Sequence, residues 1–183
     1  MFRFSQKNLD PILQVTHAED LLLAGKYYEY VQELKKAPND ESKVVAVQVF
    51  QDFVTLSNTE RYSSLTLLGH FALIEALITH DPHKFGDSLN HQLSTKMPLL
   101  MRRWPCPLDP ACFFPIQDLR TVWKRLYELR SIIAHGGKPD FTKNRLRDLR
   151  SGYAAYQFVR AALKRLIIQT FHEPQLVNDL KAC

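Results

Sequence analysis

Leu65-Thr-Leu-Leu-Gly-His-Phe-Ala-Leu-Ile-Glu-Ala-Leu-Ile78 is apolar around most of its circumference when drawn as a helix. Its apolar residues recur at intervals of three and four, which is the period of an α-helix, and the stretch is longer than a typical strand. A helix that is apolar on nearly every side must be surrounded by other elements. We therefore expect these residues, Leu65 included, to be buried at the centre of an all-α protein.

The segments on either side of this helix show the same period, and the predicted helices span residues 8–24, 26–36, 41–56, 87–103, 117–134 and 143–171. Residues 57–60 offer side chains that could cap the central helix, and prolines between 105 and 115 force an irregular loop. The prediction is a bundle of about five to seven helices with 65–78, 117–134 and 143–171 at its centre. The apolar residues expected to face the core from 41–56 are Val44, Val45, Val47, Phe50, Phe53 and Val54.

Length and composition favour a single domain, since the chain has 183 residues and 45% of them are apolar. No run of 18 apolar residues is present, and the N-terminus lacks the apolar centre of a signal peptide. The expected location is therefore the cytoplasm, without a membrane partner. The cysteines are expected to be free thiols, because their number is odd and no export signal accompanies them: Cys106, Cys112 and Cys183.

Positive charge is concentrated in residues 120–165, which hold 12 Lys and Arg against 3 Asp and Glu in a chain of net charge +5. Such asymmetry is what a polyanion-binding face requires, although a solvated basic surface has the same composition. If 143–171 is one helix, three-, four- and seven-residue steps place a polar stripe on one face. We expect this stripe to follow an RNA backbone: Lys143, Arg147, Arg150, Gln157 and Lys164.

Several kinds of catalytic or metal-binding motif are absent from the sequence. Gly136-Gly137 is not followed by Lys-Ser or Lys-Thr at the spacing of a phosphate-binding loop, and no Gly-x-Ser-x-Gly occurs. Cys106 and Cys112 are too far apart for a zinc knuckle, and His80-Asp-Pro-His83 has no second ligand pair of suitable spacing. We therefore expect neither a metal nor a cofactor.

Arg130 and His135 differ from this background. Arg130 stands in an apolar helix and needs a partner or a wet cleft, since burying it alone is costly. Glu75 is equally out of place in the central helix, so the two could form a pair that orients Arg130 or merely neutralises it. His135 falls at a helix end, where the following glycines stop the helix. On an ideal helix Arg130 and His135 are about 140° apart in projection and roughly 7.5 Å apart in rise, so they do not share a ridge.

The segment Leu129-Arg-Ser-Ile-Ile-Ala-His-Gly-Gly137 resembles the RxxxxH motif of HEPN domains. The glycine after the histidine and the upstream Ala72-Leu-Ile-Glu-Ala-Leu77 are most similar to the Apea-like branch. The resemblance covers about residues 60–171, on which helices in 8–56 would pack, and leaves the order of 172–183 open. It implies a helical bundle that commonly dimerises. Many members are metal-independent endoribonucleases in defence, toxin or RNA-processing systems, and others are inactive binding or scaffold domains.

The resemblance assigns the catalytic arginine to Arg130 and the catalytic histidine to His135. The position after the arginine, often Asn, Asp or His in active members, is Ser131 here, which is polar but does not titrate near neutral pH. RNA can supply its own 2′-OH as nucleophile, so the protein needs a proton donor and acceptor and a fixed cation. His135 exchanges protons near neutral pH, and Arg130 stays charged and can hold two phosphate oxygens.

The leading hypothesis is an RNA-cleaving homodimer that uses Arg130 and His135, with Glu75 and Ser131 in supporting positions. One alternative is a module of the same fold that binds RNA or a nucleotide and performs no chemistry. Another is a protein-interaction subunit, bound for example by an antitoxin or another regulator. The aromatic residues of the loop 104–115 would offer a surface for such a partner, although loop aromatics also commonly fill their own core.

Overall fold

The computed structural model of the chain describes residues 25, 28–29, 31–33, 41–59, 62–80 and 87–183. These residues form six labelled α-helices and two short 3-10 helices, and no β-strand occurs among them, which confirms the all-α prediction. The predicted helix 8–24 lies outside the described residues, as does most of 26–36. The elements are α2 (Glu41–Ser57), α3 (Ser64–Ile78), α5 (Leu89–Met101), η1 (Pro110–Cys112), α6 (Leu119–Ala134), η2 (Asn144–Leu149), α7 (Gly152–His172) and α8 (Pro174–Ala182).

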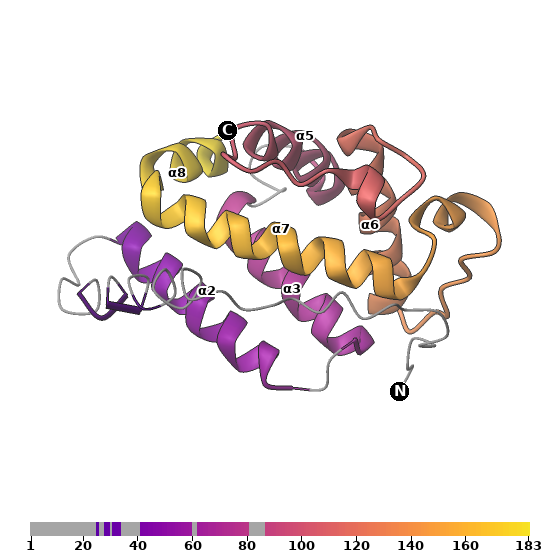
Figure 1. Cartoon of the computed structure of the whole chain (residues 1–183), viewed down its shortest axis with the longest axis horizontal. Helices are drawn as coiled ribbons and strands as arrows, with labels where there is room; N and C mark the ends of the chain where they lie inside the picture. Colours follow the sequence, from indigo (N-terminus) through magenta and orange to yellow (C-terminus); the bar gives the residue numbers. More distant parts are fainter. Residues whose placement is uncertain (1–24, 26–27, 30, 34–40, 60–61, 81–86) are drawn as a thin grey trace.

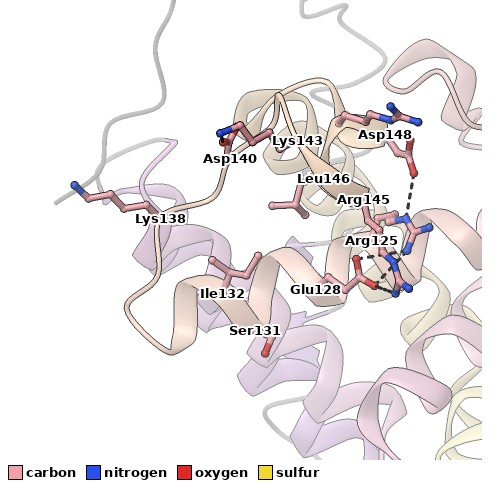
Figure 2. Close-up of a pocket in the computed structure, with 11 residues that line it drawn as sticks. Arg125, Glu128, Ser131, Ile132, Lys138, Asp140, Lys143, Arg145, Leu146 and Asp148 are labelled. Atoms are coloured by element: carbon pink, nitrogen blue, oxygen red, sulfur yellow. Dashed lines mark hydrogen bonds and ion pairs between the residues drawn. The ribbon is translucent and has the colours of Figure 1, made fainter.

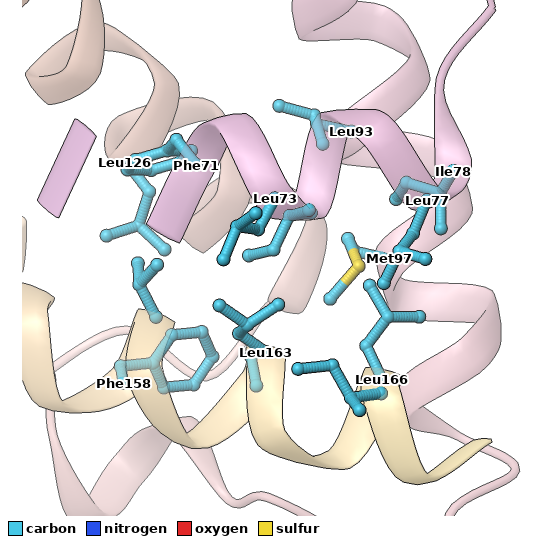
Figure 3. Close-up of a cluster of buried hydrophobic side chains, with 14 of the residues drawn as sticks. Phe71, Leu73, Leu77, Ile78, Leu93, Met97, Leu126, Phe158, Leu163 and Leu166 are labelled. Atoms are coloured by element: carbon cyan, nitrogen blue, oxygen red, sulfur yellow. The ribbon is translucent and has the colours of Figure 1, made fainter. Parts of the chain in front are cut away.

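Helix α3 lies at the centre, as its sequence predicts, because it packs against each of the other five labelled α-helices. The long α7 runs along it through the middle of the molecule, with α2 on one side and α5 and α8 on the other (Figure 1). Between α3 and α7 the interior is filled by interdigitating apolar side chains (Figure 3), among them Phe71, Leu77, Phe158, Leu163 and Leu166.

The start of α3 differs from the predicted one. Residues 58–59 form a turn after α2, and the cap is Ser63, whose hydroxyl accepts a hydrogen bond from the Thr66 N–H at 3.1 Å. Leu65, predicted to be inward, is 76% exposed because it lies on the face of α3 that also exposes Ala72 and Ala76. On α2, Val45 and Val54 are also exposed, since the buried stripe follows Ala46, Val47, Val49 and Phe53. Val44 lies in a part of α2 whose side chains are not described.

The predicted single helix 143–171 is wrong, because the chain breaks at Arg150. Residues 144–149 form the 3-10 helix η2, and Arg150 has φ 56° and ψ −56°. The Ser151 N–H donates to the Leu149 carbonyl at 2.5 Å, which closes a tight γ-turn. The new helix α7 then begins with Ser151 as its cap, the hydroxyl accepting from the Ala154 N–H at 3.1 Å.

The proline-rich loop fills the core of its own chain. Trp104 and Phe114 are 5% and 1% exposed, and the ring of Phe113 meets Phe158 edge-on at 5.4 Å. Cys106 and Cys112, together with Cys183 at the other end of the described chain, are exposed and unpaired with one another. The loop therefore presents thiols to solvent and keeps its large aromatic residues inside.

Residues 173–183, whose order the sequence leaves open, include the helix α8. Its Val177 is 1% exposed and belongs to the core. The Lys181 ammonium donates to the Ala76 carbonyl on α3 at 2.6 Å. The last helix is therefore an integral part of the bundle.

One imidazole lies in the core. His70 of α3 is 0% exposed, with its ring 5.3 Å from Tyr156 and 5.8 Å from Phe53, and neither ring nitrogen has a hydrogen-bond partner in the described part of the chain. Burial, assisted by the positive charge of Arg160, lowers the pKa of His70 from 6.5 to about 4. The folded protein thus holds this side chain neutral.

We predict that His70→Leu reduces the acid sensitivity of the fold. Because the pKa is lowered on folding, His70 contributes no penalty above pH 6.5, and stability is lost as the pH falls from 6.5 towards 4. The loss from this one group is about 3 kcal/mol. Denaturant unfolding at pH 7 and pH 4 should show a smaller decrease for His70→Leu than for the wild type. The exposed His91 of α5, replaced by leucine, is the control. An equal decrease in all three proteins would contradict the prediction.

Candidate functional site

The site is built on the C-terminal end of α6. The helix begins at Asp118, whose carboxylate accepts from the Thr121 N–H at 2.9 Å. It ends at His135, and Gly136 follows with φ 73°. Gly136 N–H donates to the Ile133 carbonyl at 3.0 Å and Gly137 N–H to the Ile132 carbonyl at 2.8 Å. This paired closure is a Schellman motif, so His135-Gly136-Gly137 ends the helix as predicted.

Arg130 lies against α3 and pairs with Glu75. Its Nη2 donates to Glu75 Oε2 at 3.3 Å, and its Nε lies 3.2 Å from Oε1 without the angle of a hydrogen bond. The side chains are 28% and 15% exposed, and the guanidinium carbon lies 5.8 Å from the centre of the Tyr127 ring. Arg130 is thus held in one place while part of it still meets solvent.

Burial raises the pKa of Glu75 above its usual value, and the charge and hydrogen bond of Arg130 oppose that rise. Each member of the pair therefore compensates for the burial of the other. Loss of either one would leave a partly buried polar or charged group without its partner.

His135 is exposed and faces away from Arg130. Its backbone N–H donates to the Ser131 carbonyl at 3.1 Å, so helical geometry continues to this residue. Four residues turn a helix by about 400°, which places His135 almost directly above Ser131 and roughly 140° from Arg130. Within one chain, Arg130 and His135 therefore serve different faces of α6.

A groove of about 970 Å³ lies between the C-terminal half of α6 and the segment formed by η2 and the turn before it (Figure 2). The groove is lined by Arg125, Glu128, Ser131, Ile132, Lys138, Asp140, Lys143, Arg145, Leu146, Arg147 and Asp148. Arg130 and His135 are not among these residues. Ser131 and Ile132 are therefore the residues of the motif segment that reach the groove.

The charged residues of the groove form a network between α6 and η2. Arg125 donates to Asp148 at 3.1 Å and to Glu128 at 3.2 Å, and Arg145 donates to the same Glu128 at 3.0 Å (Figure 2). Sequence reasoning did not find this network. Only its i,i+3 pair on α6, Arg125 and Glu128, is visible in the sequence, because the partners on η2 depend on how the chain turns back.

The predicted stripe of the last helix is not one face. Lys143 and Arg147 line the groove, Arg150 is exposed at the γ-turn, and Lys164 is exposed on the separate helix α7. Gln157 donates to the hydroxyl of Tyr153 at 2.8 Å. The break at Arg150 rotates α7 out of register with η2, so the spacing that joined these residues no longer applies.

Within the described part of the chain, no group of three or more His, Cys, Asp and Glu residues could hold a metal. His80 Nδ1 lies 3.1 Å from the Lys181 carbonyl and 3.2 Å from Lys96 Nζ, and His83 is outside the described residues. None of the helices described is both long and apolar enough to cross a bilayer.

Comparison of the chain with protein-family models, with curated proteins and with solved structures finds no match. The assignment of a function therefore depends on the chemistry of the residues around α6.

We predict that Glu75 and Arg130 are energetically coupled. A double-mutant cycle with Glu75→Gln and Arg130→Met should give a coupling energy of about 1 to 2 kcal/mol, between the values typical of surface and buried ion pairs. Denaturant unfolding of the four proteins measures it.

The pair Arg103–Glu173, with 59% and 45% of the side chains exposed at 3.4 Å, is the control for this cycle. Its coupling should be close to zero, because exposed ion pairs contribute little. A Glu75–Arg130 coupling no larger than that of the control would mean that the contact does not orient Arg130.

Proposed function

We propose that the protein is a metal-independent endoribonuclease of the HEPN type, acting in the cytoplasm as a homodimer through His135 and Arg130. The observation that carries the proposal is that the end of α6 holds both a fixed cation and an accessible imidazole. Arg130 is clamped by Glu75 yet partly open to solvent, and the exposed His135 ends the same helix beside a groove rich in cations. RNA cleavage by attack of the 2′-OH requires these two groups, because the imidazole exchanges protons and the cation stabilises the charge on the phosphate.

In this proposal His135 exchanges protons with the 2′-OH that attacks or with the 5′-oxygen that leaves. Arg130 stabilises the charge that develops on the phosphorane, and it is effective because Glu75 fixes its position before the substrate arrives. Ser131 contributes a hydroxyl on the His135 face and does not titrate. The products are a 2′,3′-cyclic phosphate and a free 5′-hydroxyl, with no metal or other cofactor in the reaction.

The orientation of the two groups is the reason for proposing a homodimer. Arg130 and His135 point about 140° apart around α6, so one chain presents them to a single phosphate only with difficulty. A second copy related by a twofold axis would bring its Arg130 to the phosphate that faces His135 of the first, and the reverse contact would form a second site.

The second candidate function is RNA binding without cleavage. The Glu75 carboxylate favours this function over cleavage. An Arg130 whose charge is neutralised by Glu75 attracts the reacting phosphate less strongly than a free arginine does, which weakens its catalytic role. An inactive protein of this class would retain RNA affinity while leaving the RNA intact.

We predict that His135→Ala lowers the cleavage rate by about 100- to 10,000-fold, the usual contribution of a proton-transfer group. Arg130→Gln should lower it by about 100- to 1,000-fold and retain a polar contact with Glu75. Gel analysis of RNA fragments would measure both. His91→Ala, a change at an exposed histidine on α5, should cleave at the wild-type rate.

Cleavage should persist in EDTA and fail on RNA with 2′-deoxyribose at the cut site, because the 2′-OH is the nucleophile. A folded His135→Ala protein with wild-type activity would remove the motif from the mechanism. Loss of wild-type activity in chelator would place the reaction elsewhere.

We further predict that two inactive variants complement each other. An equal mixture of His135→Ala and Arg130→Gln chains forms heterodimers that contain one intact composite site. After subunit exchange the mixture should recover about a quarter of the wild-type activity. Light scattering should show a dimer. No recovery in a mixture shown to exchange subunits would mean that each chain completes its own site.

A further inference from the structure

We infer that the groove between α6 and η2 binds a segment of single-stranded RNA. The phosphates would lie on its cationic rim (Lys143, Arg145 and Arg147), and a base would lie against its apolar floor (Ile132 and Leu146). This inference rests on RNA being the ligand of the proposed function, and it specifies the strand type and the residues that hold the strand. Three observations support it: some cations of the rim lack a strong acid partner, the acids of the lining are paired within the protein, and the floor is apolar.

The cations of the rim are available to a ligand to different extents. Arg147 is exposed and has no acid within 4.0 Å among the described residues. The Lys143 side chain is 76% exposed, and its Nζ lies 3.8 Å from Asp140 Oδ2. This long ion pair is weak, so a phosphate can replace it. Arg145 is 71% exposed although it touches Glu128. Arg147 is therefore the cation with most to gain from a phosphate.

The three acids of the lining are already engaged within the protein. Glu128 and Asp148 hold Arg125 and Arg145. Asp140 accepts from the N–H and the hydroxyl of Thr142 at 2.9 and 2.6 Å, and these hydrogen bonds hold the pKa of Asp140 below its usual value. Because these carboxylates are directed at their own neighbours, they hold Arg125 and Arg145 in place and leave the rim with a positive balance.

The floor of the groove is apolar. Ile132 of α6 and Leu146 of η2 lie between the two charged walls (Figure 2), and Leu146 is 5% exposed. A flat base or a ribose can cover such a floor, whereas a bare phosphate gains nothing from it. In duplex RNA the base faces are stacked and inaccessible, so the floor selects an unpaired strand.

The groove also leads to the proposed catalytic histidine. Ser131 lines it, and His135 lies one helical turn further along the same face of α6. A strand held by Arg147 and Ile132 would therefore continue past Ser131 towards His135 of the same chain.

The experiment measures binding of a short fluorescein-labelled RNA by fluorescence anisotropy, with 2′-O-methyl groups so that cleavage cannot occur. Arg147→Gln should weaken binding and lower the slope of log affinity against log salt by about 0.7, the value of one phosphate contact on a single strand. Lys124→Gln removes the same charge from an exposed position on α6 outside the groove and should leave the slope unchanged. Equal effects of the two variants, or no effect of Arg147→Gln, would overturn the inference.

The floor is tested by Ile132→Thr, which keeps the branched β-carbon and makes the floor more polar. Affinity for the single strand should fall by about fourfold, the effect of losing roughly one buried methylene, without a change in the salt slope. Thermal unfolding confirms that the variant is folded. A duplex of the same sequence should compete weakly, and a duplex that competes as well as the single strand would contradict the strand preference.

The failure of this inference is separable from that of the proposed nuclease. If the wild-type protein cleaves no RNA but Arg147→Gln lowers the salt slope of RNA binding, the proposed nuclease activity is overturned and RNA binding in the groove is supported. A wild-type protein that cleaves RNA with a KM unaffected by Arg147→Gln would do the reverse.

Discussion

The carboxylate of Glu75 is the only charged group of α3, a helix that packs against all five of the other labelled α-helices. A carboxylate in that position requires a cation, and Arg130 supplies it from α6. The contact agrees with the apolar face of α6, whose Trp123 and Leu126 are 0% exposed, and together they fix the rotation of α6 about its own axis. Once Arg130 faces α3, the 100° step of a helix directs Ser131 and Ile132 towards η2. The same rotation of α6 thus determines both which group is clamped by Glu75 and which face borders the groove.

The sequence predicts best where one local cause dominates. The apolar circumference of α3 and the His-Gly-Gly end of α6 are both found, because burial and glycine conformation act without long-range information. The Glu75–Arg130 contact could also be anticipated, since Glu75 is the lone charge of the apolar helix α3 and Arg130 stands in an apolar run, between Leu129 and Ile132, at the end of α6. In each case a single physical requirement leaves one solution.

The sequence predicts poorly where competing local signals must be weighed. Residues 143–171 have helical periodicity throughout, yet Ser151 and Gly152 start a new helix, and the strained conformation of Arg150 joins it to η2. The serine was the available signal, since its hydroxyl is suited to capping. The network of Arg125, Arg145 and Asp148 could not be predicted, because it exists only after η2 folds back across α6.

The two leucines of η2 have a mechanical consequence for the groove. Leu146 and Leu149 are 5% and 0% exposed, so the wall that carries Lys143 and Arg147 is anchored in the core on both sides of Arg147. Widening the groove would require withdrawing these side chains from the interior. The backbone of the wall is therefore preorganised: an incoming strand meets a segment already in position, and the backbone entropy of this segment was lost when the chain folded rather than when the ligand binds.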